Sequence, residues 1–280
     1  MIEPFLKWAG GKRWLVNNYD HLFPLYFNRY IEPFLGSGAV FFRLCPKEAV
    51  LADTNAELVN AYRQVQAAPD RINHLLDRYQ QSHCTKLSYG CRRSTPQEPL
   101  ERASRFIYLN RTCWNGLYRV NRRGDFNVPI GTKTIVAYPD QYLQKVSSLL
   151  GNAKIIVSDF EQAIADAREG DLVYVDPPYT VTHNTNNFLK YNAQLFSWDD
   201  QIRLYRVLKK AASRGALITV SNANHECIRN LYARFGIQHC IERSSNLSAS
   251  AAHRKKTTEL LITSFETKLK DNNMIPKKLA

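Results

Sequence analysis

The chain of 280 residues is 44% hydrophobic and 22% charged, the composition of a globular protein with one large domain. Its formal charge of +13 favours a polyanionic partner, most commonly nucleic acid, over a merely basic soluble protein. The sequence lacks both an apolar run of about 20 residues and a signal peptide at its start, which argues against a membrane span and against secretion.

The cysteines indicate the redox compartment. None of the six belongs to a C-x-x-C pair, which predicts reduced thiols in a cytoplasmic protein and no metal. A zinc site formed by His83, Cys84 and Cys91 is the weaker alternative.

In chain order, the first informative stretch is residues 5–12, where Gly10 and Gly11 let the backbone turn tightly or approach a ligand. A helix is predicted to follow, as far as residue 19. Lys12 at its start can meet a carboxylate, and Trp8 offers a flat face for stacking. An ordinary start of a helix with Trp8 in the core is the structural alternative.

The next stretch predicts a strand, a G-x-G turn at Gly36 and Gly38, and a helix, which is the first unit of a nucleotide-binding α/β domain. A second apolar run at 49–52 ends in Asp53, whose carboxylate can accept hydrogen bonds from ribose hydroxyls. Together they predict a cofactor that contains adenosine. A P-loop is absent from the sequence, which argues against ATP as a phosphoryl donor.

The middle of the chain is the most basic part. Residues 54–75 are periodic and helical, 82–99 read as a loop, and 100–110 as a helix. Turn signals within 111–129 then predict an exposed hairpin. Arginine, asparagine and aromatic residues interleave there, as they do where a protein reads DNA. A solvated basic face is the alternative.

The second half predicts strands at 154–159, 171–175 and 216–220, a helix at 199–213, and a closing pair of strands at 237–242 and 258–263. Polar segments at 180–194 and 244–256 are predicted to be loops, the first of them over the site. The strand at 171–175 ends in Asp176-Pro177-Pro178-Tyr179. Neither proline can donate a backbone hydrogen bond and each fixes its own φ, so the corner is stiff.

The Asp176 corner offers a carboxylate, a fixed carbonyl and an aromatic ring. Two acceptors for an NH2 group and a flat face suit chemistry on the exocyclic amine of a nucleobase. A strand-terminating turn with a buried tyrosine is the structural alternative.

Several motifs along the chain agree with one family. They are Phe5-Leu6-Lys7-Trp8-Ala9-Gly10-Gly11-Lys12, Glu32-Pro33-Phe34 with Gly36-x-Gly38, Leu51-Ala52-Asp53, Leu109-Asn110-Arg111, Asn115-Gly116-Leu117-x-Arg119, Gly124-x-Phe126-Asn127-Val128-Pro129 and Asp176-Pro177-Pro178-Tyr179. In this order they resemble the α group of the Dam-type DNA adenine-N6 methyltransferases, over residues 5–261. The resemblance implies an α/β fold: a Rossmann-like sheet that binds S-adenosylmethionine, with an inserted, mostly helical target-recognition domain that carries a β-hairpin.

The resemblance also implies domain boundaries. The catalytic domain would comprise 1–55 and 146–265, the recognition insert 56–145, and a flexible basic tail 266–280. S-adenosylmethionine would be the methyl donor and S-adenosylhomocysteine the product, without a metal. Double-stranded DNA would be the partner of a monomer.

The site residues follow from the same resemblance. The catalytic residues would be Asp176, Pro177, Pro178 and Tyr179. The cofactor-binding residues would be Trp8, Lys12, Phe34, Gly36, Gly38, Asp53, Asp159 and Asp176. The DNA-binding residues would be Lys7, Arg111, Trp114, Asn115, Leu117, Arg119, Asn121, Pro129 and Lys133. Trp114 and Lys133 stand where tyrosines are common in the family, and Asp159 is at a variable position.

The implied reaction is methylation of N6 of a flipped-out adenine, within GATC or a close variant. Tyr179 would stack on the base, while the Asp176 carboxylate and the Pro177 carbonyl accept the amine hydrogens. An enzyme that methylates N4 of cytosine or an RNA base is one alternative. A DNA-binding protein without catalytic activity on the same scaffold is another.

Overall fold

The computed structural model describes residues 2–84, 90–94, 96–121, 124–180, 196–243 and 257–267. The predicted loops at 181–194 and 244–256 and the tail from 268 lie outside these ranges. Its helices are α1 (Arg13–Asn18), α2 (Ala39–Leu44), α3 (Ala56–Ala67), α4 (Pro69–Gln81), α6 (Pro99–Thr112), α7 (Tyr142–Leu150), α8 (Phe160–Ile164), α10 (Trp198–Ser213) and α11 (Glu226–Leu231), with 3₁₀ turns η1 (Asp20–Leu22) and η2 (Trp114–Gly116).

The strands form one twisted sheet in the order β3-β2-β1-β4-β5-β7-β6. Their bounds are β1 (Tyr30–Glu32), β2 (Ala49–Asp53), β3 (Ala153–Val157), β4 (Leu172–Val175), β5 (Leu217–Ala223), β6 (Ile237–Arg243) and β7 (Thr257–Thr263). The first five strands pair in parallel, while β7 pairs antiparallel with both β5 and β6. The expected closing pair of strands is confirmed.

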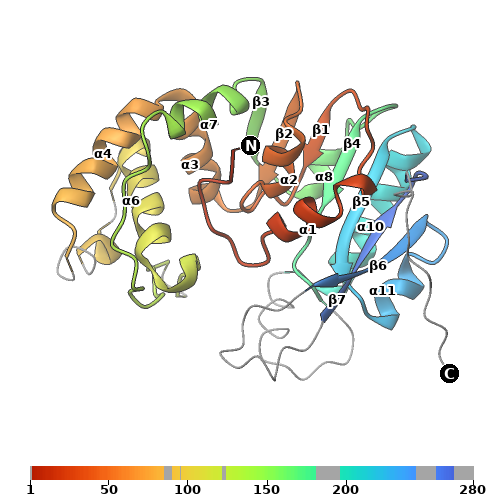
Figure 1. Ribbon diagram of the computed structural model, residues 1–280. Coiled ribbons are helices and arrows are strands. Elements are labelled where there is room, and N and C mark those ends of the chain that lie inside the picture. The colour runs from red at the N-terminus through yellow and green to blue at the C-terminus, as the bar shows by residue number, and fades with distance from the viewer. Residues whose placement is uncertain are drawn as a thin grey trace.

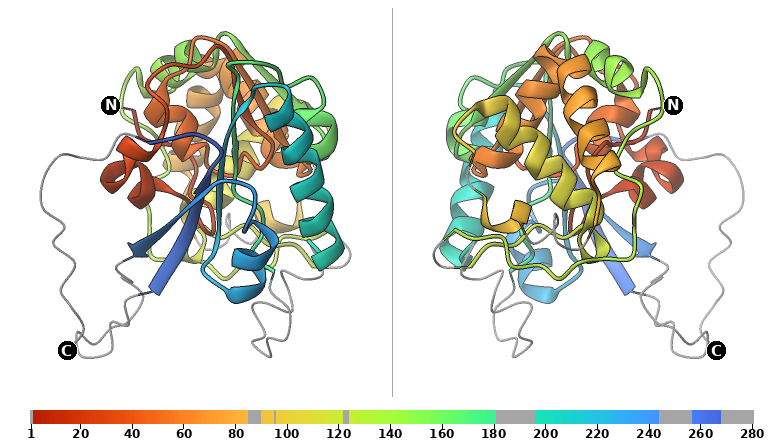
Figure 2. Two further views of the ribbon diagram at one scale, coloured as in Figure 1. Left: turned by 90° about the vertical axis from the view of Figure 1, so that its right-hand side faces the viewer. Right: turned by 90° about the vertical axis from the view of Figure 1, so that its left-hand side faces the viewer.

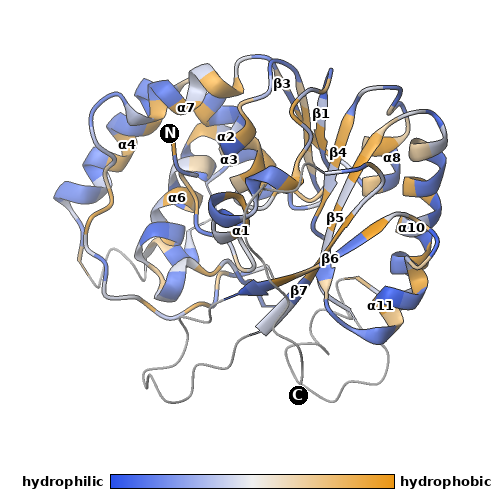
Figure 3. Cartoon of the chain, turned by 45° about the vertical axis from the view of Figure 1, so that its right-hand side comes forward, coloured by the Kyte–Doolittle hydropathy of each residue, from blue (hydrophilic) through white to orange (hydrophobic). Residues whose placement is uncertain are grey.

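Helices cover both faces of the sheet (Figures 1 and 2). One face carries a core shared with α1–α4, α6 and α7, and the other a core shared with α8, α10 and α11. β1 and β4 are buried along their whole length; the sequence of β4 is accordingly apolar throughout, whereas β1 ends in the buried Glu32. Figure 3 shows the orange of hydrophobic residues running along these central strands.

The helical region expected at 54–75 is formed by two helices. α3 ends at Ala67 and α4 begins at Pro69, with Ala68 between them in a non-helical conformation. A proline lacks the N–H that would continue a helix and disfavours helical backbone at the residue before it, whereas it fits the first turn of a new helix.

The expected hairpin within 111–129 is present only as isolated antiparallel bridges. Val120 pairs with Phe126, and Cys113 pairs with Ile130. Side-chain bonds replace part of a regular ladder, since the Asn121 amide donates to Asp125 Oδ2 at 3.1 Å and its oxygen accepts from the Asp125 N–H at 3.0 Å. The domain boundary expected after residue 145 falls inside α7.

Candidate active site

Three acidic residues stand at the carboxyl ends of neighbouring parallel strands. Glu32 ends β1, Asp53 ends β2, and Asp176 directly follows β4. The order of the sheet reverses at β1, which lies between β2 and β4. Ligands of open α/β sheets bind outside the carboxyl ends of the strands at such a reversal. The topology therefore brings the expected cofactor and catalytic motifs to one edge.

Asp176 belongs to a cluster of charged and polar groups from distant parts of the chain. Lys12, just before α1, places its Nζ 3.1 Å from Asp176 Oδ1 and 3.2 Å from Glu259 Oε2 on β7. The Lys12 ammonium also donates to the Tyr179 hydroxyl at 2.8 Å. That hydroxyl donates to Glu259 Oε2 at 2.6 Å and lies 3.1 Å from Ser221 Oγ. Contacts of the hydroxyl group therefore fix the position of the Tyr179 ring.

The backbone of the corner is equally fixed. Pro177 is buried, and the Pro178 carbonyl accepts a 3.5 Å bond from the Gln201 side chain on α10. On the other side of the cluster, Arg243 Nη1 lies 3.1 Å from Glu259 Oε1. The four ion-paired side chains Lys12, Arg243, Asp176 and Glu259 balance in charge, which offsets the cost of burying them.

Burial raises the pKa of two carboxylates at this edge of the sheet, those of Asp176 and Glu32. Loss of water is the main cause that raises the pKa of Asp176 to about 6; the Lys12 ammonium opposes this rise and the Glu259 carboxylate adds to it. Burial holds the pKa of Glu32 well above its usual range, and the charges of Asp176 and Asp53 raise it further. Glu32 is 3% exposed, and its Oε2 has no partner among the described residues.

The expected cofactor turn lies against Trp8. Gly36 and Gly38 both have positive φ, at 47° and 63°. A Cβ on Gly36 would come within 2.8 Å of the Trp8 ring, so only glycine fits there. The Gly36 N–H donates to Asp53 Oδ2 at 3.2 Å, which ties the turn to the end of β2.

Trp8 also contacts the segment that follows α6, so it lies between that segment and the turn at Gly36. Its ring stacks on Tyr118 with centroids 6.0 Å apart and planes 14° apart. The buried Asn110 of α6 holds the preceding residue, since it accepts from the Lys7 N–H at 3.0 Å and donates to the Lys7 carbonyl at 2.8 Å. Its amide also donates to the Gly116 carbonyl at 2.9 Å. Asn110 therefore fixes Lys7 against the 113–117 segment.

Most of the expected DNA-binding residues lie between residues 111 and 133, and Asn110 holds Lys7 beside that segment. Trp114, Asn115, Arg119, Asn121, Pro129 and Lys133 are exposed, and Lys7 and Leu117 are half-buried. Arg119 Nε donates to Asn127 Oδ1 at 2.8 Å, which orients the guanidinium. Burial is the main cause that lowers the pKa of Lys7, and the nearby Lys133 ammonium lowers it further. Two cations placed together favour an anion between them.

The family model of D12 class N6 adenine-specific DNA methyltransferases matches residues 8–246, a span that includes the Gly36 turn, the recognition segment and the Asp176 corner. The chain belongs to this family. It is an adenine-specific DNA methyltransferase with a Rossmann-like fold.

Curated relatives agree with this assignment. The Type II methyltransferase M1.LlaDCHI of Lactococcus lactis subsp. cremoris is 37% identical, covering 94% of this chain and 96% of the relative. The Type II methyltransferase M.MjaIII of Methanocaldococcus jannaschii is 34% identical, with coverages of 94% and 99%. The DNA adenine methylase of Escherichia coli strain K12 is 31% identical, with coverages of 92% and 93%.

Two expected site residues of the methyltransferase are engaged in internal contacts. Asp159 caps α8 and pairs with Arg203, whose Nη1 and Nη2 each lie 2.9 Å from one of its oxygens. Arg111 donates to the carbonyls of Ile135 and Ala137 and stacks over the Tyr138 ring at 3.9 Å. Phe34 packs in an aromatic cluster, with its ring centroid 5.7 Å from that of Phe160 and 5.6 Å from that of Phe196.

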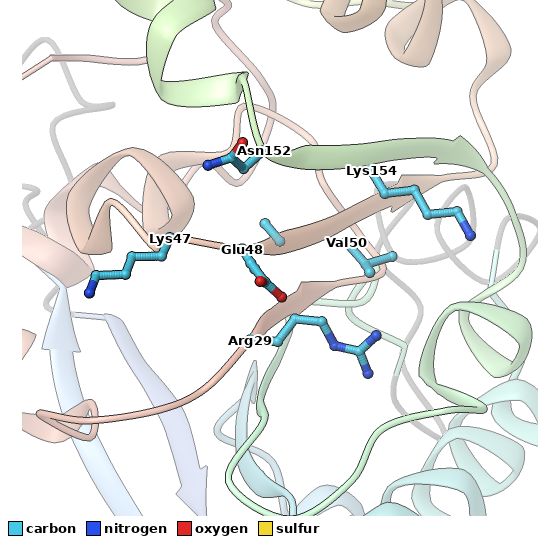
Figure 4. Close-up of a pocket in the computed structure, with 7 residues that line it drawn as sticks. Arg29, Lys47, Glu48, Val50, Asn152 and Lys154 are labelled. Carbon is cyan, nitrogen blue, oxygen red and sulfur yellow. The ribbon is translucent and has the colours of Figure 1, made fainter.

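A shallow groove of about 560 Å³ lies at the opposite edge of the sheet, where β1–β3 begin (Figure 4). Basic side chains line much of it, but Arg29 is already paired with Asp166 and Asp171. The groove lies far along the strands from Asp176, so the chemistry belongs to the carboxyl edge. Among the described residues no cluster of metal-ligand type is present, and no described helix is long and apolar enough to cross a membrane.

Sequence reasoning missed Glu259, Ser221 and Asn127, and it gave no role to Asn110. Glu259 carried a usable signal: an acid within the apolar strand at 258–263, where a buried charge needs a partner. Asn127 lies within one of the motifs that carry the family resemblance, but that motif does not indicate its bond to Arg119. Ser221 carried no signal, because its contact with Tyr179 joins segments that no local pattern connects.

Proposed function

We propose that the enzyme transfers the methyl group of S-adenosylmethionine to N6 of an adenine that is flipped out of double-stranded DNA, within GATC or a close variant. The observation that carries this proposal is the corner at Asp176: an ionisable carboxylate, stiff prolines and an anchored aromatic ring at the sheet reversal. GATC is the target that the Dam-type resemblance implies, and the curated relatives named DNA adenine methylase support adenine in DNA as the substrate.

The residues beside the corner fit this cofactor. Asp53 supplies a carboxylate for ribose hydroxyls next to the glycine turn, and Trp8 supplies an aromatic wall. Asp53 and Asp176 place carboxylates at one edge of the sheet, which suits a cationic sulfonium ligand. When bound, S-adenosylmethionine supplies the electrophilic methyl group.

The Asp176 carboxylate then acts on the target amine. The lone pair of the adenine N6 is delocalised into the ring, which makes it a poor nucleophile. Hydrogen bonds from the amine to Asp176 and to the Pro177 carbonyl localise that lone pair and stabilise the positive charge that develops on N6. The Tyr179 ring, whose hydroxyl is fixed by Lys12, Glu259 and Ser221, offers a rigid face for stacking.

Target reading is assigned to the exposed segment that carries Leu117 and Arg119. A guanidinium held by Asn127 can pair with O6 and N7 of guanine, and an apolar side chain such as Leu117 can contact a thymine methyl. Lys7 and Lys133 supply positive charge beside it. Flipping the target base costs a few kcal/mol, which these contacts must offset.

The experiment is incubation of the purified protein with labelled S-adenosylmethionine and unmethylated plasmid, followed by mapping of the methylated bases. Label in N6-methyladenine confined to GATC or one close variant is expected, and Asp176→Ala protein provides the blank. Label in N4-methylcytosine, or in no base at all, would reject the proposed reaction. Label in adenines of an unrelated sequence would reject only the target.

A further inference from the structure

Glu259 is an acidic residue buried inside an apolar strand. Its side chain is 7% exposed, yet β7 continues with Leu260, Leu261 and Ile262. A buried carboxylate is costly unless charged groups and hydrogen bonds compensate it. Here one oxygen contacts Lys12 and Tyr179, and the other contacts Arg243. Every contact joins Glu259 either to the catalytic corner or to the strand β6 beside it.

The contacts of Lys12 explain what such a carboxylate can do. The ammonium has three hydrogens, and it has three partners at bonding distance: Asp176, Glu259 and Tyr179. The distances to the two carboxylates differ by only 0.1 Å, 3.1 Å against 3.2 Å. The positive charge is therefore shared, and Asp176 keeps capacity to accept hydrogen bonds from a substrate amine.

We propose that Glu259 is a positioning residue for methyl transfer, which draws Lys12 away from full pairing with Asp176 and anchors the stacking ring of Tyr179. The inference rests on the proposed function, because it assigns Glu259 a part in that same reaction. Without the Glu259 charge, Asp176 would be the only carboxylate paired with Lys12 among the described residues, and the acceptor 2.6 Å from the Tyr179 hydroxyl would no longer be charged.

A purely structural role is the competing explanation. Glu259 and Arg243 link the two antiparallel strands, and Lys12 ties them to the start of the chain, so the pair could act only as a brace. If Glu259 only holds the strands together, its replacement lowers the stability of the fold and reduces every activity by the same factor. A positioning residue also changes the protonation of Asp176, which faces Lys12 from the start of α1, Glu259 from β7 and Glu32 from β1.

The test compares Glu259→Gln with wild type on duplexes that the wild type methylates. The single-turnover rate at its pH plateau should fall about 10- to 100-fold, as when outer partners of metal ligands are removed. The acid limb of kcat/KM, which reports the free enzyme, should move to lower pH by about one unit. The pKa of Asp176 falls because the neighbouring negative charge of Glu259 is removed and Lys12 no longer pairs with a second carboxylate. Glu242→Gln, an exposed acid of the same strand pair, is the matched control and should leave both unchanged.

Unchanged rates for Glu259→Gln would overturn the inference, and so would a lower rate with an unmoved acid limb. If Glu259→Gln fails to unfold cooperatively, Glu259→Asp replaces it: the charge stays, the shorter side chain cannot reach both Lys12 and Tyr179, and a wild-type rate would then overturn the inference. Methylation of the wrong base by the wild type rejects the proposed function separately. A wild type that methylates no duplex overturns both.

Discussion

Asp176 has the sharpest experimental signature of any single residue in the enzyme. Replacing it by alanine should reduce methyl transfer by about 100- to 1000-fold, the loss seen when one preorganised electrostatic group is removed elsewhere. DNA affinity should stay close to wild type, because we assign the phosphate contacts to exposed basic residues of the proposed recognition segment and not to Asp176. Radiolabel transfer and a DNA-binding titration at one salt concentration measure the two quantities. Retention of more than about a tenth of the rate would reassign the acceptor.

The same residue fixes the pH dependence. Only the ionised carboxylate is purely an acceptor, and burial raises the pKa of Asp176 to about 6. kcat/KM should therefore be low below pH 6, rise through that value and level off above it. A profile that rises instead near the ordinary aspartate value of about 4 would show that the carboxylate is not desolvated.

Asp53 tests the cofactor half of the site. Its Oδ2 accepts from the Gly36 N–H and its Oδ1 from the Asn55 N–H at 2.9 Å, so the carboxylate is oriented before any ligand arrives. Asp53→Ala should weaken S-adenosylmethionine binding by about 1.5–3 kcal/mol, the value of a hydrogen bond to a charged group. Calorimetric titration of the DNA-free enzyme measures it, and unchanged affinity would move the ribose contact to another residue.

At the scale of elements, the segment from η2 to Pro129 is the proposed recognition surface, and the strand pairing of its described residues consists of isolated bridges. Arg119→Ala should reduce discrimination at one base pair of the target by about 1–3 kcal/mol, while general DNA affinity falls less. Asn127→Ala should reproduce part of this loss, because its side-chain oxygen orients the guanidinium.

The measurement for Arg119 is methylation of matched duplexes, each with one base pair of the target replaced. Glu242→Gln again serves as the control, since Glu242 lies on β6, outside the recognition segment. An equal loss on every duplex would make Arg119 a phosphate contact instead of a base reader.

The elements also show what the sequence could and could not predict. Strand ends with acids, the G-x-G turn and the proline corner were predictable, since each depends on residues adjacent in the chain. The division of the helical region 54–75 into α3 and α4 follows from Pro69 and could have been predicted. Glu259 could not be placed, because its partners depend on β7 entering the sheet between β5 and β6. The internal contacts of Asp159 likewise depend on α10 packing beside α8.

At the scale of the whole molecule, the recognition region and the catalytic sheet share one core. Phe106, Leu109 and Leu143 of the helical region belong to the same buried cluster as Leu51 and Tyr174 of the sheet. The second core of the sheet, with α8, α10 and α11, includes no described residue of α3, α4, α6 or α7, so the helical region depends on the core that it shares with the sheet and the two should unfold together. Scanning calorimetry should show a single transition whose van't Hoff and calorimetric enthalpies agree. Two separable transitions would instead make the recognition region an independent domain.

The ion pair between Lys12 and Glu259 also has a consequence for folding during synthesis on the ribosome. The ammonium lies near the beginning of the chain, and its second carboxylate stands on β7, the last strand described. While the nascent polypeptide still lacks that strand, Lys12 has only Asp176 as a carboxylate partner among the described residues. On the role proposed for Glu259, a nascent chain would complete the surroundings of Asp176 only after β7 has paired with β5 and β6, so methyl transfer would become possible late in synthesis.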